Sequence, residues 1–325
     1  MRIRRRGVLG VAAGLTAPGI VRAQGAWPRQ PVRLICPFAA GGPTDVAARI
    51  VADGLSNILP ERVVVENRTG SGVVVGTEMV AKGPKDGTTF LYSTVAHSVL
   101  RGLFNNLSFD PVRDFQPVAL LGTIPMLLQV NNQVPAQDLR ALMAMIRENP
   151  GRFDYGSSGA GGAVHLATEL FLHAAGGLKM NHVPYRGAAP AMPDLLNGSL
   201  TMFLNVASDG VESVRRGQTR GLAISSAKRM PQLPDLPTFF EAGLPGYEAY
   251  TWHMLLAPTG TPEEIVRKLN EAANAVVRDG RAQQRFTDMT IEPRSDTTPA
   301  TASAWLAAEI AKWEPVVKTI GMTPA

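Results

Sequence analysis

PFAAGGPTD, at residues 37–45, is the stretch that decides the fold. It continues the apolar run VRLICPF (32–38) and precedes apolar residues at helical spacing from Asp45 to Leu55. Short apolar runs suit a strand buried on both faces, and Thr44 and Asp45 are good N-cap residues. The stretch therefore predicts a strand, a glycine turn and a helix N-terminus. Because glycine lets backbone approach a ligand and a helix N-terminus attracts negative charge, the turn is either an anion site or an ordinary strand-to-helix turn.

A second stretch, YGSSGAGGAVH (155–165), repeats this order of features more than a hundred residues later. Strand-like residues 153–155 lead into its Ser/Gly turn, and apolar residues at helical spacing follow from Val164 to Ala174. One such loop in each half of the chain is what a ligand cleft between two α/β lobes requires. The repetition therefore favours an anion site over two unrelated turns.

Strands alternate with helices along the chain, which predicts mostly parallel sheets with ligands at the carboxyl ends of the strands. Phe115 to Val130 reads as two apolar segments hinged at Thr123–Pro125, where we place the first crossing between lobes, and Tyr247–Ala257 is the second. One lobe then comprises residues 24–124 and 249–325, and the other residues 125–248. Strands are expected at 32–38, 62–66, 89–94, 153–155, 182–185, 200–205 and 220–225, and helices at 45–55, 74–81, 138–148, 164–174, 190–196, 261–277, 280–288 and 299–320.

Residues 1–23 have the features of an export signal, and they carry the excess positive charge of the chain. They hold five of its 32 Lys and Arg residues and none of its 27 Asp and Glu residues, so the remainder is neutral. A basic segment (2–6) precedes an apolar stretch (7–20) that is too short to span a membrane. Arg5-Arg6 resembles a twin-arginine signal, and residues 21–23 predict cleavage after Ala23 and a periplasmic location.

Several classes of protein find little support. A neutral mature chain with few aromatic residues does not suit nucleic-acid binding. The sole cysteine, Cys36, lies in an apolar run and cannot form a disulfide within the chain, and the histidines lack metal-ligand spacing. No complete nucleotide motif is present, so neither a cofactor nor a metal is expected. Residues 156–160 read GSSGA, which fails the G-x-S-x-G pattern of serine hydrolases.

Neutral polar residues stand where the predicted strands end: Thr44, Ser93, Thr94, Ser157, Ser158 and Asn205. Together with glycine backbone they can hold a carboxylate by hydrogen bonds without a buried arginine. Three further residues stay ambiguous. Arg186 is either near the ligand or a solvated loop residue. His165 either lines the cleft or is a satisfied half-buried histidine, and Trp252 either walls the cleft or packs in the hinge.

Seven stretches, taken in order, carry a resemblance to a known family. They are PFAAGGPTD (37–45), VVVENRTGSG (63–72), FDPVRDFQPVALL (109–121), YGSSGAGGAVHLATELF (155–171), HVPYRGAAPAMPDLLNG (182–198), LAISSAKRMPQLPDLPTFFEAGLPGYE (222–248) and APTGTP (257–262). The chain resembles the extracytoplasmic solute-binding receptors of tripartite tricarboxylate transporters, the Bug family, from about residue 31 to residue 319.

The resemblance implies an α/β, two-lobed, type II periplasmic-binding-protein fold, each lobe a mostly parallel sheet flanked by helices, with the ligand cleft between them. It implies capture of a small organic carboxylate and its delivery to a two-component integral membrane transporter. In the family, the loop after the first strand and the Ser-rich loop hold the carboxylate, and further polar tips line the cleft. With the candidates named above, the predicted ligand-binding residues are Phe38, Gly42, Pro43, Thr44, Asp45, Thr94, Ala96, Ser157, Ser158, Gly161, His165, Tyr185, Asn205 and Trp252.

Two departures from the family pattern bear on specificity. Gly161-Gly162 replaces a hydroxyl, and Leu204-Asn205-Val206 stands where the family often has Phe-Asp-Asn. Loss of that acid favours a second carboxylate or a neutral polar group on the ligand.

We expect a monomeric receptor and not an enzyme. A receptor that feeds a sensor kinase, and a secreted hydrolase that uses Ser158 and His165, are the alternatives.

Overall fold

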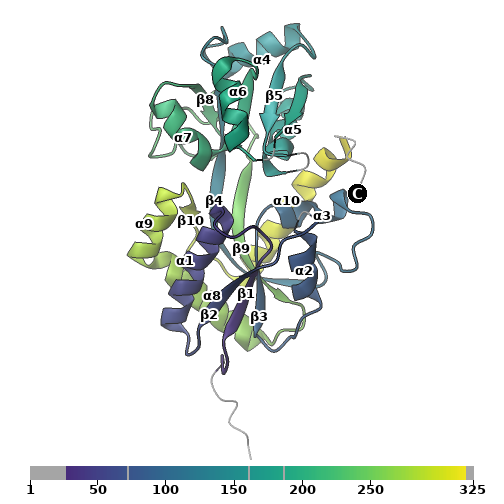
Figure 1. Ribbon diagram of the computed structural model, residues 1–325, viewed down its shortest axis with the longest axis vertical. Helices are drawn as coiled ribbons and strands as arrows, with labels where there is room; N and C mark the ends of the chain where they lie inside the picture. Colours follow the sequence, from purple (N-terminus) through teal and green to yellow (C-terminus); the bar gives the residue numbers. More distant parts are fainter. Residues whose placement is uncertain (1–26, 72, 160–161, 186, 320–325) are drawn as a thin grey trace, which may run out of the picture.

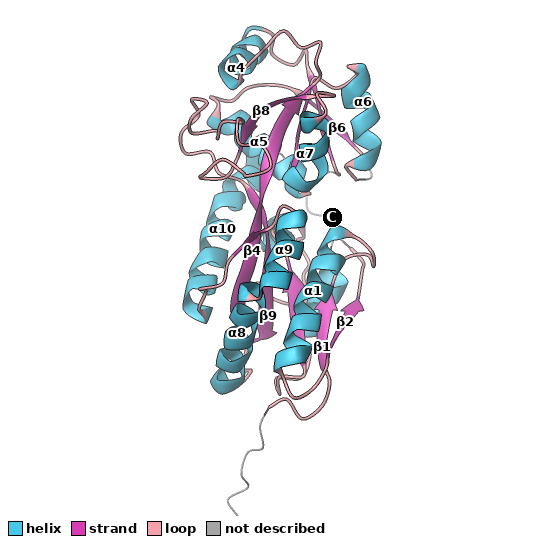
Figure 2. Ribbon diagram, turned by 90° about the vertical axis from the view of Figure 1, so that its left-hand side faces the viewer, coloured by secondary structure: helices cyan, strands magenta, loops and turns pink. Residues whose placement is uncertain are grey.

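One 16-residue strand, β4 (Phe115–Val130), runs through both halves of the molecule (Figures 1 and 2). The computed structural model describes residues 27–319 except 72, 160–161 and 186. Residues 115–125 of β4 pair with two strands in the lower half of Figure 1, and residues 126–130 pair with two strands in the upper half. The change of partner falls at Pro125, where a missing N–H is tolerated because a sheet ends there.

The lower sheet has the order β2 (Val63–Asn67), β1 (Val32–Cys36), β3 (Thr89–Ser93), β9 (Tyr250–Pro258), β4. The strand β1 pairs in parallel with β2 and β3, whereas β9 is antiparallel to both β3 and β4. Four of these five strands therefore point the same way. A short strand, β10 (Glu292–Pro293), pairs with β4 on its other edge.

The upper sheet places β4 between β8 (Arg220–Ile224) and β7 (Met202–Val206), followed by β5 (Asp154–Ser157) and β6 (Asn181–Pro184). β5 is parallel to β6 and β7, and β4 is antiparallel to β7 and β8. Again four of the five strands share a direction. The two mostly parallel sheets expected from the sequence are thus joined through β4.

Helices cover both faces of each sheet (Figure 1). The helices are α1 (Pro43–Ile58), α2 (Val74–Ala81), α3 (Ala96–Leu103), α4 (Leu139–Glu148), α5 (Ala163–Ala174), α6 (Met192–Asn197), α7 (Ala207–Arg215), α8 (Glu263–Arg278), α9 (Gly280–Asp288) and α10 (Pro299–Thr319), with a short 3-10 turn at Ala189–Ala191. α10 contacts β4 and α3 and also reaches α5 of the upper half.

Side chains of β1 alternate between two cores. Leu34 and Cys36 pack among residues of α1 and α8, and Ile35 packs on the other face with residues of α3 and α10. All three are almost fully buried. This two-sided burial explains the consecutive apolar residues Leu34, Ile35 and Cys36.

The start of α1 corrects one prediction. The helix begins at Pro43, with Gly42 at the N-cap and no side-chain cap, so neither Thr44 nor Asp45 caps it. Proline suits the first helical position because its missing N–H is not needed there. The preceding strand also stops at Cys36, before Phe38.

Two further predictions were wrong. β4 is one continuous strand rather than two hinged segments, with register shifts near Pro117–Ala119 and Leu120–Gly122. Helices α3 and α7 were not predicted. Both start directly from a strand end without a side-chain cap, and each contains a glycine (Gly102, Gly210) that weakens the helical pattern. Among the described helices, none is long and apolar enough to cross a membrane.

Candidate ligand-binding site

A cavity of about 540 Å³ lies between the two halves of the molecule. Its walls come from the lower half (Phe38, Pro43, Thr44, Val73, Thr94, Val95, Ala96, Val99, Leu103 and Phe104), from the upper half (Ser158, Gly162, Ala163, Val164, Leu166, Val206, Ser208 and Asp209) and from β4 and β9 (Ile124, Thr251 and His253). The volume suits a small molecule.

Four helices begin at this cavity. α1 and α3 of the lower half, and α5 and α7 of the upper half, each contribute residues of their first turn to its wall. Their N-cap residues are Gly42, Val95, Gly162 and Val206, and none of the four has a side-chain capping hydrogen bond. The first N–H groups of a helix lack intrahelical partners and carry partial positive charge. The ends of α1, α5 and α7 directed at one space make a site for an anion, whereas the first N–H groups of α3 already bond Thr94 and the Val95 carbonyl.

The charges in the wall fit recognition by backbone. No Lys or Arg lines the cavity among the described residues, and Asp209 is the one charged residue that does. Asp209 is exposed at the cavity wall, yet burial by the surrounding protein raises its pKa, against a hydrogen bond of 3.3 Å from Ser208 Oγ that lowers it. Residues 204–206 contain no acid, unlike the family pattern, but Asp209 supplies a carboxylate to the cavity wall about one helical turn later.

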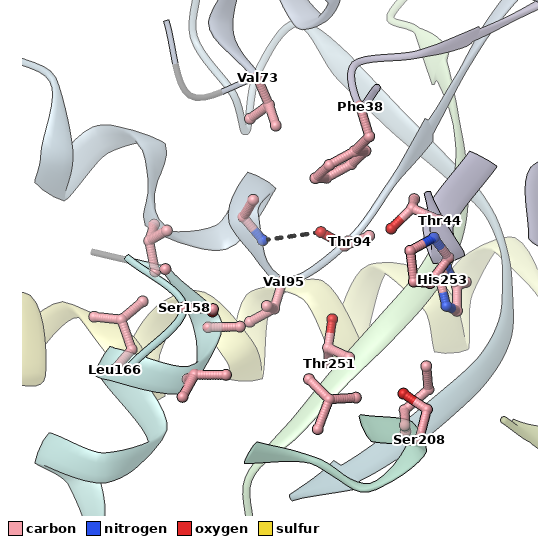
Figure 3. Close-up of a pocket in the computed structure, with 18 of the residues that line it drawn as sticks. Phe38, Thr44, Val73, Thr94, Val95, Ser158, Leu166, Ser208, Thr251 and His253 are labelled. Carbon is pink, nitrogen blue, oxygen red and sulfur yellow. Dashed lines mark hydrogen bonds between the residues drawn. The ribbon is translucent and has the colours of Figure 1, made fainter. Parts of the chain in front are cut away.

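The two sides of the cavity differ in polarity. Figure 3 shows Val73, Val95 and Leu166 on one side, together with the Ser158 hydroxyl, and Thr44, Thr251, Ser208 and His253 on the other. Thr94 lies between them, and its hydroxyl accepts a hydrogen bond of 3.4 Å from the Ala96 N–H (Figure 3). A ligand with an apolar body and a polar edge matches this division.

Asp45 shapes the first loop from behind. Its carboxylate accepts hydrogen bonds from the Gly41 N–H (2.8 Å), Arg49 Nε (2.9 Å) and Asn67 Nδ2 (2.9 Å). Burial works to raise the pKa of Asp45, but these bonds, led by that from Arg49, lower it overall. Asp45 is 2% exposed and is not among the residues that line the cavity. It thus connects the loop to the end of β2.

Ser157 and His165 support the second loop in a similar way. Ser157 Oγ lies 2.6 Å from His182 Nε2, and the His165 and His182 rings stack with centroids 3.8 Å apart. Burial, and then the neighbouring His165, lower the pKa of His182 to about 4. Ser158, the next residue, lines the cavity. The histidine stack therefore lies behind the loop, and His182 had no predicted role.

The remaining predicted residues divide into two groups. Phe38, Pro43, Thr44, Thr94, Ala96 and Ser158 line the cavity, whereas Gly42, Asp45, Ser157, His165, Tyr185, Asn205 and Trp252 are not among its lining residues. Gly161 and Arg186 lie outside the described residues.

Three members of the second group have other partners. The Tyr185 hydroxyl donates to Asp194 (2.6 Å), and the buried Asn205 accepts from the Val206 N–H (2.8 Å). Trp252 is fully buried, and its Nε1 donates to Glu309 of α10 over 3.0 Å. Trp252 thus packs against α10, which is the second of the two roles considered for it.

The sequence analysis missed several lining residues, above all Thr251, His253, Ser208 and Asp209. A signal for two of them was present. Side chains alternate along a strand, so placing Trp252 on one face of β9 puts Thr251 and His253 together on the other. No such signal existed for Ser208 and Asp209, because α7 was not predicted. Among the described residues, no group of His, Cys, Asp and Glu could hold a metal ion.

Comparison with known proteins agrees with this geometry. Residues 47–322 match the model of the tripartite tricarboxylate transporter family receptor. Protein BugT of Bordetella pertussis is 34% identical over 317 residues, which cover 97% of this chain and 96% of BugT.

Two solved structures are similar over the whole fold. R. palustris Rpa4515 with adipate has a TM-score of 0.78 and 36% identity, covering 92% of this chain and all of that one. MatC of Rhodopseudomonas palustris with bound malate has a TM-score of 0.74 and 31% identity, covering 90% of this chain and all of that one. The sequence, the two-lobed type II periplasmic-binding-protein fold and these relatives agree: the chain belongs to the receptor family of tripartite tricarboxylate transporters, the Bug solute-binding proteins.

Proposed function

We propose that the protein is a periplasmic receptor, and not an enzyme, that captures a small organic carboxylate and delivers it to a two-component membrane transporter. The observation that carries this proposal is the meeting of the helix N-termini of α1, α5 and α7, none with a side-chain cap, on one cavity. Backbone N–H groups can hold a carboxylate there without an arginine. The two similar structures hold adipate and malate, which are both carboxylates.

The proposal extends to export and to assembly. We propose that residues 1–23 are a twin-arginine signal removed after Ala23, and that the mature protein is a monomer. N-terminal sequencing of the protein from the periplasm should begin at Gln24. A first residue of Met1, or a protein retained in the cytoplasm, would contradict the export proposal.

The experiment that tests ligand capture is thermal unfolding of residues 24–325 with a panel of organic acids. A ligand at a hundred times its Kd adds about 2.7 kcal/mol to the free energy of unfolding, which raises Tm by several degrees. At least one acid should raise Tm, and its amide or methyl ester should not. If acids and esters act alike, or if no acid acts and mass spectrometry finds no ligand retained from purification, the proposal fails.

A pair of variants tests the role of the helix ends. Ala163→Asp places a carboxylate on the first residue of α5, at the cavity, where it competes with the ligand for the same N–H groups. Ala141→Asp makes the same change in the first turn of α4, which does not line the cavity. We expect Ala163→Asp to weaken binding by at least about tenfold, a loss of 1.4 kcal/mol, and Ala141→Asp to leave it unchanged. Equal ligand affinities of the two variants would show that the N-terminus of α5 does not bind the ligand carboxylate.

A further inference from the structure

His253 is a buried polar group that the fold itself does not satisfy. It lies on β9, is 3% exposed and lines the cavity. Neither ring nitrogen has a hydrogen-bond partner among the described residues. Its ring packs at a tilt on Tyr92, with centroids 5.4 Å apart, which holds its position without involving either nitrogen. Since buried polar groups in proteins nearly always have partners, a ligand is the natural partner for this one.

The protonation state of His253 defines what it can bind. Burial lowers its pKa to about 4, so the imidazole is neutral at physiological pH. A neutral imidazole offers one N–H donor and one nitrogen acceptor. A hydroxyl group matches either nitrogen because it can both donate and accept. A methyl group matches neither.

The other groups around the cavity narrow the ligand class. Figure 3 places His253 among Thr44, Thr251 and Ser208, and places Val73, Leu166 and Ser158 across the cavity from it. Asp209 adds a carboxylate to the wall that comes from α7. A second carboxylate on the ligand would meet this like charge and would find no described Lys or Arg in the wall. A hydroxyl meets no such repulsion.

We propose that the ligand is a hydroxylated monocarboxylate with an apolar body, and that His253 is the specificity residue that hydrogen-bonds its hydroxyl group. This proposal rests on the proposed function, since the helix N-termini hold the ligand's one carboxylate. His253 then discriminates between acids of the same size. A site that hydrogen-bonds a ligand hydroxyl rejects the analogue that lacks it, because the buried partner is left unpaired.

Two triads of acids of matched size test the proposal by calorimetry at pH 7.5 on residues 24–325. Hexanoate, 6-hydroxyhexanoate and adipate differ only in a terminal methyl, hydroxymethyl or carboxylate group, and 4-methylbenzoate, 4-hydroxybenzoate and terephthalate form an aromatic counterpart. In at least one triad, the hydroxylated acid should bind at least about tenfold more tightly than both other members.

Variants of His253 and Asp209 test whether these residues produce the preference for the hydroxylated acid. His253→Phe keeps an aromatic ring against Tyr92 but removes both nitrogens, so it should abolish the preference for the hydroxyl while retaining affinity for the parent acid. His253→Gln keeps a donor and an acceptor and should preserve the preference, which also controls for folding. Asp209→Asn should reduce the difference in affinity between the hydroxylated acid and the dicarboxylic acid.

The possible outcomes distinguish the proposal for His253 from the proposed function as a carboxylate receptor. Binding that requires a carboxylate but shows no hydroxyl preference in either triad overturns the specificity proposal alone. The specificity proposal is also overturned if His253→Phe retains the preference for the hydroxylated acid. It is overturned as well if His253→Phe weakens binding of all three acids of a triad equally, because His253 would then contact the carboxylate. If no acid of either triad binds, or methyl esters bind as well as the acids, the proposed function fails and the specificity proposal falls with it.

Discussion

At the scale of single residues, the cavity depends on side chains that do not line it. Asp45 and Ser157 lie behind the two loops and accept hydrogen bonds from the backbone N–H groups of Gly41 and Gly159, and His182 pairs with the Ser157 hydroxyl. Asp45 and Ser157 were predicted to bind the ligand but do not line the cavity, because residue type does not reveal which way a side chain points. Thr44, Thr94 and Ser158, which end strands or start helices, do line it.

Replacing Asp45 with Asn should destabilise the first loop and weaken ligand binding. The amide keeps one acceptor oxygen but loses the charge that faces Arg49 and one of the acceptors now used by Gly41 and Asn67. We expect the free energy of unfolding to fall by about 1–3 kcal/mol in urea titration. Asp53→Asn is the matched control, because Asp53 lies on the same helix with its side chain 73% exposed. Equal stability of the two variants would contradict the supporting role of Asp45.

Buried histidines predict a loss of stability in mild acid. Burial lowers the pKa values of His97 and His253 to about 4, against about 6.5 in the unfolded chain. Between pH 6.5 and pH 4 the unfolded state therefore binds more protons, so the free energy of unfolding falls as the pH falls. At pH 5.5, each of these two histidines should lower the free energy of unfolding by about 1 kcal/mol. Tm measured from pH 7.5 to pH 4.5 should decline, and His97→Gln should make the decline shallower. A constant Tm down to pH 5 would refute this account.

At the scale of elements, the sequence located most strands and helices, including α2, which has no side-chain cap, and missed α3 and α7. Helices α2 and α9 were predicted with their observed bounds, Val74–Ala81 and Gly280–Asp288. α3 and α7 were missed, and both are elements whose first turns build the cavity. The absence of a cap leaves the first N–H groups of α7 for a ligand and also removes the usual sequence signal for a helix start, whereas the first N–H of α3 already bonds the Thr94 hydroxyl.

The contact between α1 and α8 offers a test of packing at this scale. A Cβ added at Gly54 of α1 would lie 2.5 Å from Val276 Cγ1 of α8, so the two helices approach closely there. Gly54→Ala should therefore reduce the free energy of unfolding by about 1–3 kcal/mol, despite the better helix propensity of alanine.

Val276→Ala in the same chain should restore part of that loss, because it removes the methyl groups that would clash. Gly280→Ala, which meets no neighbouring atom, is the control and should be within 0.5 kcal/mol of the parent. Thermal unfolding measures the stability of all four proteins: the parent, Gly54→Ala, the double variant and Gly280→Ala. A Gly54→Ala chain as stable as the parent would mean that the helices are free to separate.

At the scale of the whole molecule, the fold class was predictable and the continuity between the halves was not. Alternating strands and helices indicate two mostly parallel sheets, but local patterns cannot show that one strand belongs to both. Gly122, Thr123 and Pro125 weaken the strand pattern of β4, and pairing to β9 overrides that weakness.

We expect the two halves to close on the ligand about the strands that join them. Labels for energy transfer at Asp53→Cys on α1 and Glu212→Cys on α7 should show higher transfer when a ligand is added. Burial raises the pKa of Cys36 to about 11, so the native thiol should stay unlabelled. A second pair within the lower half, Asp53→Cys and Arg281→Cys, should not respond. Unchanged transfer for the first pair at saturating ligand would exclude closure.

The position of β9 between β3 and β4 has a consequence for how the protein is made. A ribosome releases β3 and β4 long before residues 250–258 exist, and both strands then present edges that only β9 can cover. The upper sheet, in contrast, is complete once residue 224 has emerged. Since uncovered strand edges promote aggregation, the growing chain needs protection by chaperones until its last quarter is translated. Truncations before residue 258 should therefore yield insoluble protein even though they retain the entire upper sheet.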